Sequence, residues 1–278
     1  MRRAFGFVFN GRQPPVDERF GENVAMNTAV SPLSTVDNDL AHSPAYLCFP
    51  PAGGTVLGLR GLARTSAASA VWGVEYPGHG ARLTEAPGES LAGLADGIAL
   101  ECLARFGAEG FSRTVLIGFS MGAFVALEVA QRVVGRGRPG PAGLVVVGAC
   151  APQRRVPGKY AKTDTAEAGR LLERSSADYR DSPELREYAL DLFLGDLRLT
   201  SAYPGPAKVP LSCPVVAIRG ANDPDFATGD EEIRAWRAWT TGRFTGHVVP
   251  GGHLAVLTPG EETRFWELVR SGLEPGDD

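Results

Sequence analysis

Short apolar runs recur along the chain from about residue 44 onward, and each is followed by a longer segment of mixed polarity. The runs are four to eight residues long and show almost no polar alternation. That pattern is typical of strands buried on both faces of a sheet. The predicted strands are 46–49, 70–76, 114–118, 143–149, 214–219 and 246–249.

The segments between these runs repeat apolar residues every three or four positions, which indicates helices with one buried face. In the first of them, Leu91, Leu94 and Ile98 show this spacing. The predicted helices are 89–106, 121–134, 231–239 and 261–273. Because strands alternate with helices, the chain is predicted to be an α/β protein, with a mostly parallel sheet and helices on both faces.

Two stretches depart from this alternation. Residues 152–211 separate two predicted strands and contain a helical pattern at 185–194, so we expect a helical lid over one end of the sheet. Residues 1–43 show no sustained period, and we expect an N-terminal extension that is poorly ordered or lies across the surface, with one short strand near residues 5–9. The predicted catalytic domain is then 44–278.

Composition narrows the classes of function. The chain has 278 residues, a net charge of −4 and a pI near 5.7, which argues against a nucleic-acid-binding protein. It lacks a run of 18 apolar residues that could cross a membrane, and its four cysteines form no metal-ligand pair. We therefore expect a monomeric cytoplasmic protein with reduced thiols and with neither nucleic acid nor membrane as a partner.

The strongest chemical signal is the sequence Gly118-Phe119-Ser120-Met121-Gly122, which has the form G-x-S-x-G. A predicted strand precedes it and a predicted helix follows, which is the context this motif requires. The sharp turn strains the serine backbone, and small residues two positions to either side permit it. Ser120 is therefore predicted to be a nucleophile at the N-terminus of a helix.

A serine nucleophile needs a base, which in hydrolases of this kind follows it in the chain. His253 lies just past the last predicted strand, at the sheet edge where active sites of α/β proteins gather, and is the predicted base. His247 lies inside that strand and is expected to be structural. His79 precedes the serine, and we expect it at the mouth of the pocket rather than in the role of base.

The acid that orients the base is predicted between the last two strands. The sequence after the strand 214–219 contains Asp223 and Asp225, both close to the carboxyl end of that strand. Asp223 precedes a proline, which biases it towards an extended turn, and it is preferred over Asp225.

The oxyanion of a tetrahedral intermediate needs two hydrogen-bond donors. One is the backbone N–H after the nucleophile, that of Met121; the other is expected from the loop after the first predicted strand. That loop begins with two prolines, which have no N–H, so Ala52 or Gly53 must supply the second donor.

These motifs, taken together, resemble the type II thioesterases that accompany polyketide synthases and non-ribosomal peptide synthetases. The resemblance covers roughly residues 45–270 and extends into the predicted lid, at 182–203. It rests on the segments 48–54, 76–82, 118–122, 220–224 and 251–253. Two positions depart from the family pattern, since Pro51 and Phe119 stand where members usually carry histidine.

The resemblance implies an α/β-hydrolase fold and hydrolysis of acyl thioesters on the phosphopantetheine arm of a carrier protein. Ser120 would attack the thioester carbonyl, with His253 as base and Asp223 as its orienting acid, while Met121 and Ala52 hold the oxyanion. Such chemistry requires neither metal nor cofactor. The expected biological role is removal of stalled or aberrant acyl groups.

Three other functions remain open on the same sequence. A cyclase or acyltransferase with the same site would pass the acyl group to a nucleophile other than water. An ester hydrolase of small molecules and a non-catalytic receptor are further alternatives. A basic cluster, Arg154, Arg155, Lys159 and Lys162, stands where the predicted lid begins, and we expect it to attract an acidic carrier protein.

Overall fold

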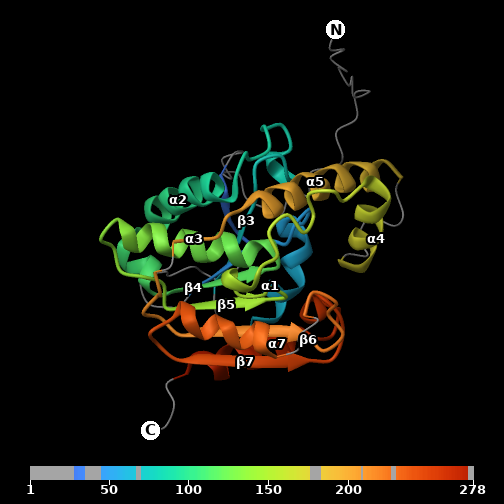
Figure 1. Cartoon of the computed structure of the whole chain (residues 1–278). Coiled ribbons are helices and arrows are strands. Elements are labelled where there is room, and N and C mark those ends of the chain that lie inside the picture. Colours follow the sequence, from blue (N-terminus) through green and yellow to red (C-terminus); the bar gives the residue numbers. More distant parts are fainter. Residues whose placement is uncertain are drawn as a thin grey trace.

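The computed structural model of the chain describes residues 28–34, 45–66, 70–175, 183–207, 209–226 and 230–274. Within them, seven strands form one sheet in the order β1-β3-β2-β4-β5-β6-β7 (Figure 1). All neighbours are parallel except β1 and β3. The strands are β1 (Val30–Pro32), β2 (Ala45–Phe49), β3 (Ala70–Val74), β4 (Thr114–Phe119), β5 (Gly143–Val147), β6 (Val215–Gly220) and β7 (Phe244–Val249).

Helices cover both faces of this sheet, as the alternation of elements predicts. On one face, Leu47 and Phe49 of β2 pack in a cluster with α2 and α3. On the other face, Tyr46 and Cys48 pack with α1 and α7. The helices are α1 (Arg60–Thr65), α2 (Leu91–Ser112), α3 (Met121–Gly135), α4 (Thr165–Ser175), α5 (Pro183–Ala202), α6 (Glu231–Arg234) and α7 (Glu262–Leu273).

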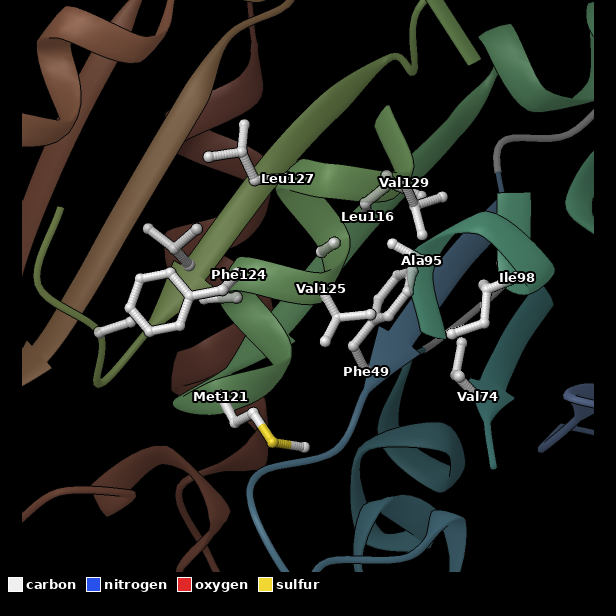
Figure 2. Packing of buried hydrophobic residues seen from close by; sticks show 14 of the residues in the cluster. Phe49, Val74, Ala95, Ile98, Leu116, Met121, Phe124, Val125, Leu127 and Val129 are labelled. Carbon is white, nitrogen blue, oxygen red and sulfur yellow. The ribbon is translucent and has the colours of Figure 1, made fainter. Parts of the chain in front are cut away.

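The larger core lies between β2, β3 and β4 on one side and α2 and α3 on the other. Figure 2 shows Phe49 of β2 directed towards Val125 of α3, and Ile98 of α2 beside Val74 of β3. All four side chains are at most 3% exposed. This packing fixes α3 against the centre of the sheet, and with it the turn at which the helix begins.

The chain between β5 and β6 forms the helical segment that its sequence pattern predicts. It contains a short 3-10 turn at Pro152–Arg154, followed by α4 and α5, which contact each other. Figure 1 shows α4 and α5 towards the end of the sheet at which the arrows of the parallel strands point. We call residues 152–211 the helical insertion.

Two elements were not predicted. Residues 30–32 form β1, an antiparallel edge strand, although they fall in the stretch expected to lie outside the domain; Val30 is fully buried there. Three residues are too few for a period to be visible in the sequence. Helix α1 follows β2 and is also missing from the prediction. The strand expected near residues 5–9 lies outside the described residues.

In the part of the chain that the structure describes, no helix is long and apolar enough to cross a membrane.

Candidate active site

The turn between β4 and α3 has the strained geometry that the G-x-S-x-G motif predicts. Ser120 has φ 50° and ψ −115°, and it is the only non-glycine residue with positive φ among those described. A Cβ atom at Gly118 would lie 2.4 Å from the Cα of Ala123, and one at Gly122 would lie 2.3 Å from the carbonyl oxygen of Phe49. Both contacts involve backbone that cannot move aside, so the turn requires both glycines.

Three predicted residues meet at this turn in one hydrogen-bonded row. His253 Nε2 lies 2.9 Å from Ser120 Oγ, and His253 Nδ1 lies 2.8 Å from Asp223 Oδ2. The side chain of Asp223 is fully buried and that of His253 is 20% exposed. A carboxylate at Nδ1 keeps the proton on that nitrogen, which leaves Nε2 free to accept the serine proton.

Backbone hydrogen bonds bring the base and its acid together from two separate loops. Beyond the ends of β6 and β7, Ala221 N–H donates to the carbonyl of Val249 at 2.7 Å, and Asn222 N–H donates to that of Gly251 at 2.9 Å. The pairing of these parallel strands thus continues into the loops. It carries Asp223 and His253, which are 30 residues apart in sequence, into contact.

Asp225, the other acid considered, points to different partners. Lys159 Nζ donates to its carboxylate at 2.6 Å and the Tyr160 hydroxyl at 2.9 Å. Its backbone N–H donates to Asp223 Oδ1 at 3.0 Å, so it also steadies the acid that contacts His253. Asp223, Asp225 and His253 offer ligand atoms within 4.8 Å of one another, the spacing of a metal site. The hydrogen bonds just described already account for this clustering.

The electrostatics of the row favour a charged imidazole. Burial by itself would lower the pKa of His253. The hydrogen bond that His253 donates to Asp223 and the negative charges of Asp223 and Asp225 outweigh burial, so the pKa of His253 is raised above its usual value. An imidazolium that forms when the serine is deprotonated is therefore stabilised.

The loop after β2 approaches the serine from the other side. Of the two residues predicted to supply an oxyanion donor, Gly53 already donates its N–H to Asp196 Oδ2 at 2.7 Å. The N–H of Ala52 makes no hydrogen bond to another described residue. Met121 is the first residue of α3, where backbone N–H groups have no partner within the helix. Among the described residues, the N–H groups of Ala52 and Met121 thus remain open beside Ser120.

A cavity of about 550 Å³ opens at the serine. Its apolar wall comes mainly from α3, the helical insertion and the loop after β7. Its polar groups include the row itself, cations and hydroxyls of the insertion, and the acidic side chains of Asp225 and Glu232. The lining includes Ala52, Ser120, Met121, Phe124, Leu171, Phe193, Leu197, His253 and Leu254. A cavity of this kind accommodates a mainly apolar group whose reacting atom reaches Ser120.

Comparison with known proteins agrees with this geometry. Residues 46–271 match the family model of the thioesterase domain. The chain belongs to the thioesterase family. It is 32% identical to the probable cadicidin biosynthesis thioesterase of Streptomyces griseus, over 80% of this chain and 64% of that protein, and so spans less than two thirds of this curated relative.

Two solved thioesterase structures have the same fold. One is the RedJ thioesterase from the prodiginine biosynthetic pathway of Streptomyces coelicolor, at 31% identity and a TM-score of 0.72, over 84% of this chain and 92% of that one. The other is YbtT, a type II thioesterase from the yersiniabactin NRPS/PKS biosynthetic pathway, at 27% identity and a TM-score of 0.70, over 88% and 98% of the two chains. The predicted family and the α/β-hydrolase fold are confirmed.

The basic cluster of this thioesterase is less open than its sequence indicates. Arg155 is half-buried, stacks on Phe124 and Tyr203 at about 5.1 Å, and donates to two backbone carbonyls at the end of α5. Lys159 is paired with Asp225. Lys159 is exposed all the same, as are Arg154 and Lys162, and Arg154 lies 3.9 Å from the carboxylate of Glu231. One of the four cations therefore faces inward, and a second is held by a carboxylate at the surface.

The other residues singled out in the sequence lie outside the hydrogen-bonded row. His247 lies in β7, outside the row. His79 is 2% exposed and contacts Asp196, so the described residues lining the cavity do not include it, contrary to the expectation. Pro51 lines the cavity, whereas Phe119 is fully buried against Phe265.

The thiols give the thioesterase no competing nucleophile among the described residues. Cys48, Cys102 and Cys213 are buried, and Cys150 is a half-buried residue of the cavity wall. Burial raises the pKa of Cys150 to about 11 and that of Cys48 to about 12. At neutral pH these groups are protonated and poorly nucleophilic.

Proposed function

We propose that this protein hydrolyses acyl thioesters on the phosphopantetheine arm of a carrier protein, through a covalent intermediate on Ser120. The observation that carries the proposal is the row of Ser120, His253 and Asp223, at 2.9 Å and 2.8 Å, opening into a mainly apolar cavity. Membership of the thioesterase family supports the choice of a thioester over other acyl compounds.

Each residue of the row has one role in the reaction. Ser120 Oγ attacks the thioester carbonyl while its proton passes to His253 Nε2, and Asp223 keeps the other imidazole nitrogen protonated. The N–H groups of Met121 and Ala52 hold the oxyanion, and one such donor typically contributes a factor of about 10²–10³ in rate. The carrier thiol leaves and takes the proton from His253. A water then loses a proton to His253 and attacks the carbonyl carbon of the acyl-enzyme. The bond to Ser120 Oγ breaks, Ser120 takes the proton back from His253, and the free acid is released.

The carrier protein as partner is the finer part of the proposal. The relatives named above belong to cadicidin, prodiginine and yersiniabactin biosynthesis, the last by an NRPS/PKS pathway. In such pathways acyl groups are held on carrier proteins, so this protein would remove stalled or aberrant groups from them. We also propose, on the basis of the sequence, that the protein is monomeric and cytoplasmic.

Carrier docking is proposed to use the exposed cations of the helical insertion. A carrier protein of this kind is usually acidic, and a basic surface accelerates the encounter. Because Arg155 and Lys159 are engaged internally, Arg154 and Lys162 are the members of the cluster that remain for this role.

Acyl-phosphopantetheine carrier proteins of graded acyl length test the proposal directly. Wild-type protein should remove the acyl mass from the carrier and release free acid. Ser120→Ala should leave the carrier acylated, whereas Ser271→Ala, at an exposed position of α7, should behave like wild type. A carrier that stays acylated with wild-type protein would contradict the proposal. A cyclised or transferred product would indicate a cyclase or acyltransferase instead.

A further inference from the structure

Asp196 of helix α5 is buried and contacts two loops, the one that follows β2 and the one that follows β3. Asp196 Oδ2 accepts the backbone N–H of Gly53 at 2.7 Å and lies 3.1 Å from His79 Nε2. Asp196 is 4% exposed and His79 is 2% exposed. Neither side chain touches the reacting atoms in the mechanism proposed above, yet the N–H that Asp196 holds is next to the proposed oxyanion donor.

His79 has acceptors at both ring nitrogens. Its Nδ1 lies 3.1 Å from the carbonyl oxygen of Pro77, and its Nε2 faces the carboxylate of Asp196. A neutral imidazole has a single N–H, so only the imidazolium donates to both. Burial would lower the pKa of His79, but the hydrogen bond and charge of Asp196, the carbonyl of Pro77 and the charge of Glu75 together raise it.

The charge on His79 matters for the acceptor strength of Asp196. An ionised carboxylate forms shorter and stronger hydrogen bonds with N–H groups than a neutral oxygen does. A carboxylate buried without a counter-charge would be unfavourable at this position. His79 lies beside the carboxylate of Asp196 and can supply that counter-charge where Asp196 meets Gly53.

Helix α5 also contacts the loop directly. Gly53 has φ +66°, and a Cβ atom there would lie 2.9 Å from the Cβ of Phe193. Phe193 and Asp196 are three residues apart, so they lie on the same face of α5. One residue of the helix therefore presses against Gly53 while the other binds its N–H.

The loop is held at its other end as well. The Tyr76 hydroxyl donates to the carbonyl oxygen of Pro50 at 3.1 Å, and Gly54 N–H closes a turn onto the carbonyl of Pro51 at 2.9 Å. Ala52 lies between these fixed points. The position of its N–H is therefore set by Tyr76 on one side and by Asp196 on the other.

We propose that Asp196 is a positioning residue for the oxyanion hole: by holding the N–H of Gly53, it fixes the neighbouring Ala52 N–H where the oxyanion forms. Helix α5 must then be in place for the intermediate to be stabilised, which couples the helical insertion to the chemistry. This inference rests on the proposed function, because it assigns a role within that same site.

The test compares Asp196→Asn with Asp191→Asn, a matched change at an exposed position of the same helix. Three quantities are measured for each variant: kcat and KM on an acyl thioester, and the inhibition constant of an alkylboronic acid. The boronic acid binds Ser120 Oγ as a tetrahedral adduct with one oxygen at the oxyanion position. Circular dichroism and thermal melting verify that each variant is folded.

Asp196→Asn should lower kcat about 10–100-fold, less than the roughly 10²–10³ expected when an oxyanion donor is lost outright. Boronate affinity should fall by a similar factor, while KM changes by less than about twofold. Asp191→Asn should match wild type in all three. If Asp196 only stabilised the fold, its replacement would not lower both kcat and boronate affinity and leave KM unchanged.

Three outcomes would overturn the inference: equal kcat for the two variants, a loss confined to KM, or unchanged boronate affinity in Asp196→Asn. Should Asp196→Asn not fold, His79→Gln replaces it, and a kcat equal to that of wild type would then count against the inference. If wild-type protein binds the boronate but does not hydrolyse thioesters, the proposed function fails. The boronate comparison still decides the role of Asp196 in that case.

Discussion

Replacing Asp223 by asparagine removes the charge behind the base with almost no change of shape. The carboxylate lies 2.8 Å from His253 Nδ1 and is fully buried, so water cannot take its place. An amide that turns its NH₂ towards Nδ1 forces the proton onto Nε2, which then cannot accept the proton of Ser120. An imidazolium formed during the reaction would also lack its buried counter-charge.

Together these effects predict a loss in kcat of about 10⁴-fold for Asp223→Asn, as is typical when a triad base is held in the wrong tautomer. That factor corresponds to about 5.4 kcal/mol in activation free energy, at 1.36 kcal/mol for each tenfold change. Single-turnover hydrolysis of an acyl thioester measures it, and thermal melting verifies that the variant is folded.

Asp225→Asn is the matched control, because it makes the same chemical change two residues away. The side chain of Asp225 binds Lys159 and Tyr160 and affects His253 through its charge. Its backbone N–H, which donates to Asp223, is the same in the variant. Its replacement should lower kcat by no more than about tenfold, the effect of a modest shift in the pKa of the base. Equal losses in the two variants, or a larger loss in Asp225→Asn, would refute the assignment of Asp223.

Three further predictions concern other features of the molecule. The pKa of His253 is raised, and only the neutral imidazole accepts a proton. The value of kcat/KM should therefore rise with pH, with the midpoint of the rise above about pH 6.5. A midpoint below that pH would contradict the raised pKa. Gly122→Ala places a Cβ 2.3 Å from a backbone oxygen and should destabilise the fold by about 1–3 kcal/mol in thermal melts, whereas Gly135→Ala, with open space around it in the same helix, should not. Charge reversal at Arg154 and Lys162 should raise KM for an acyl-carrier protein at low salt by a larger factor than KM for a small thioester, because Arg154 also lines the cavity. An unchanged carrier KM would exclude these cations from docking.

The sequence was sufficient for features that have a local cause. Five of the strands, β2 to β6, follow from apolar runs and are buried along their whole length, because strands buried on both faces have no solvent side to keep polar. The run that predicted β7 is shorter than the strand itself, and β7 is an edge strand with exposed residues. The position of Ser120 at a strained turn follows from the glycines on either side of it. Asp223 and His253 are brought together by continued pairing of the loops beyond β6 and β7, which the order of strands and acids along the chain already indicates.

Features that depend on contacts distant in sequence were not predicted. Asp196 and His79 are 117 residues apart, and neither shows in its own segment that the two will share a buried charge. Strand β1 has three residues and is defined by its pairing with β3 rather than by a period. The inward direction of Arg155 depends on carbonyls at the end of α5, so the sequence shows its charge but not its partner.

The most direct test of the central claim is the mass of the acid released from an acyl-carrier protein in H₂¹⁸O. A serine acyl-enzyme that is resolved by water predicts free acid containing one ¹⁸O atom, carrier returned to its free thiol, and no release with Ser120→Ala. Release of the acyl group without ¹⁸O, as a cyclic or transferred product, would contradict hydrolysis. Release that persists in Ser120→Ala would contradict the nucleophile on which the account depends.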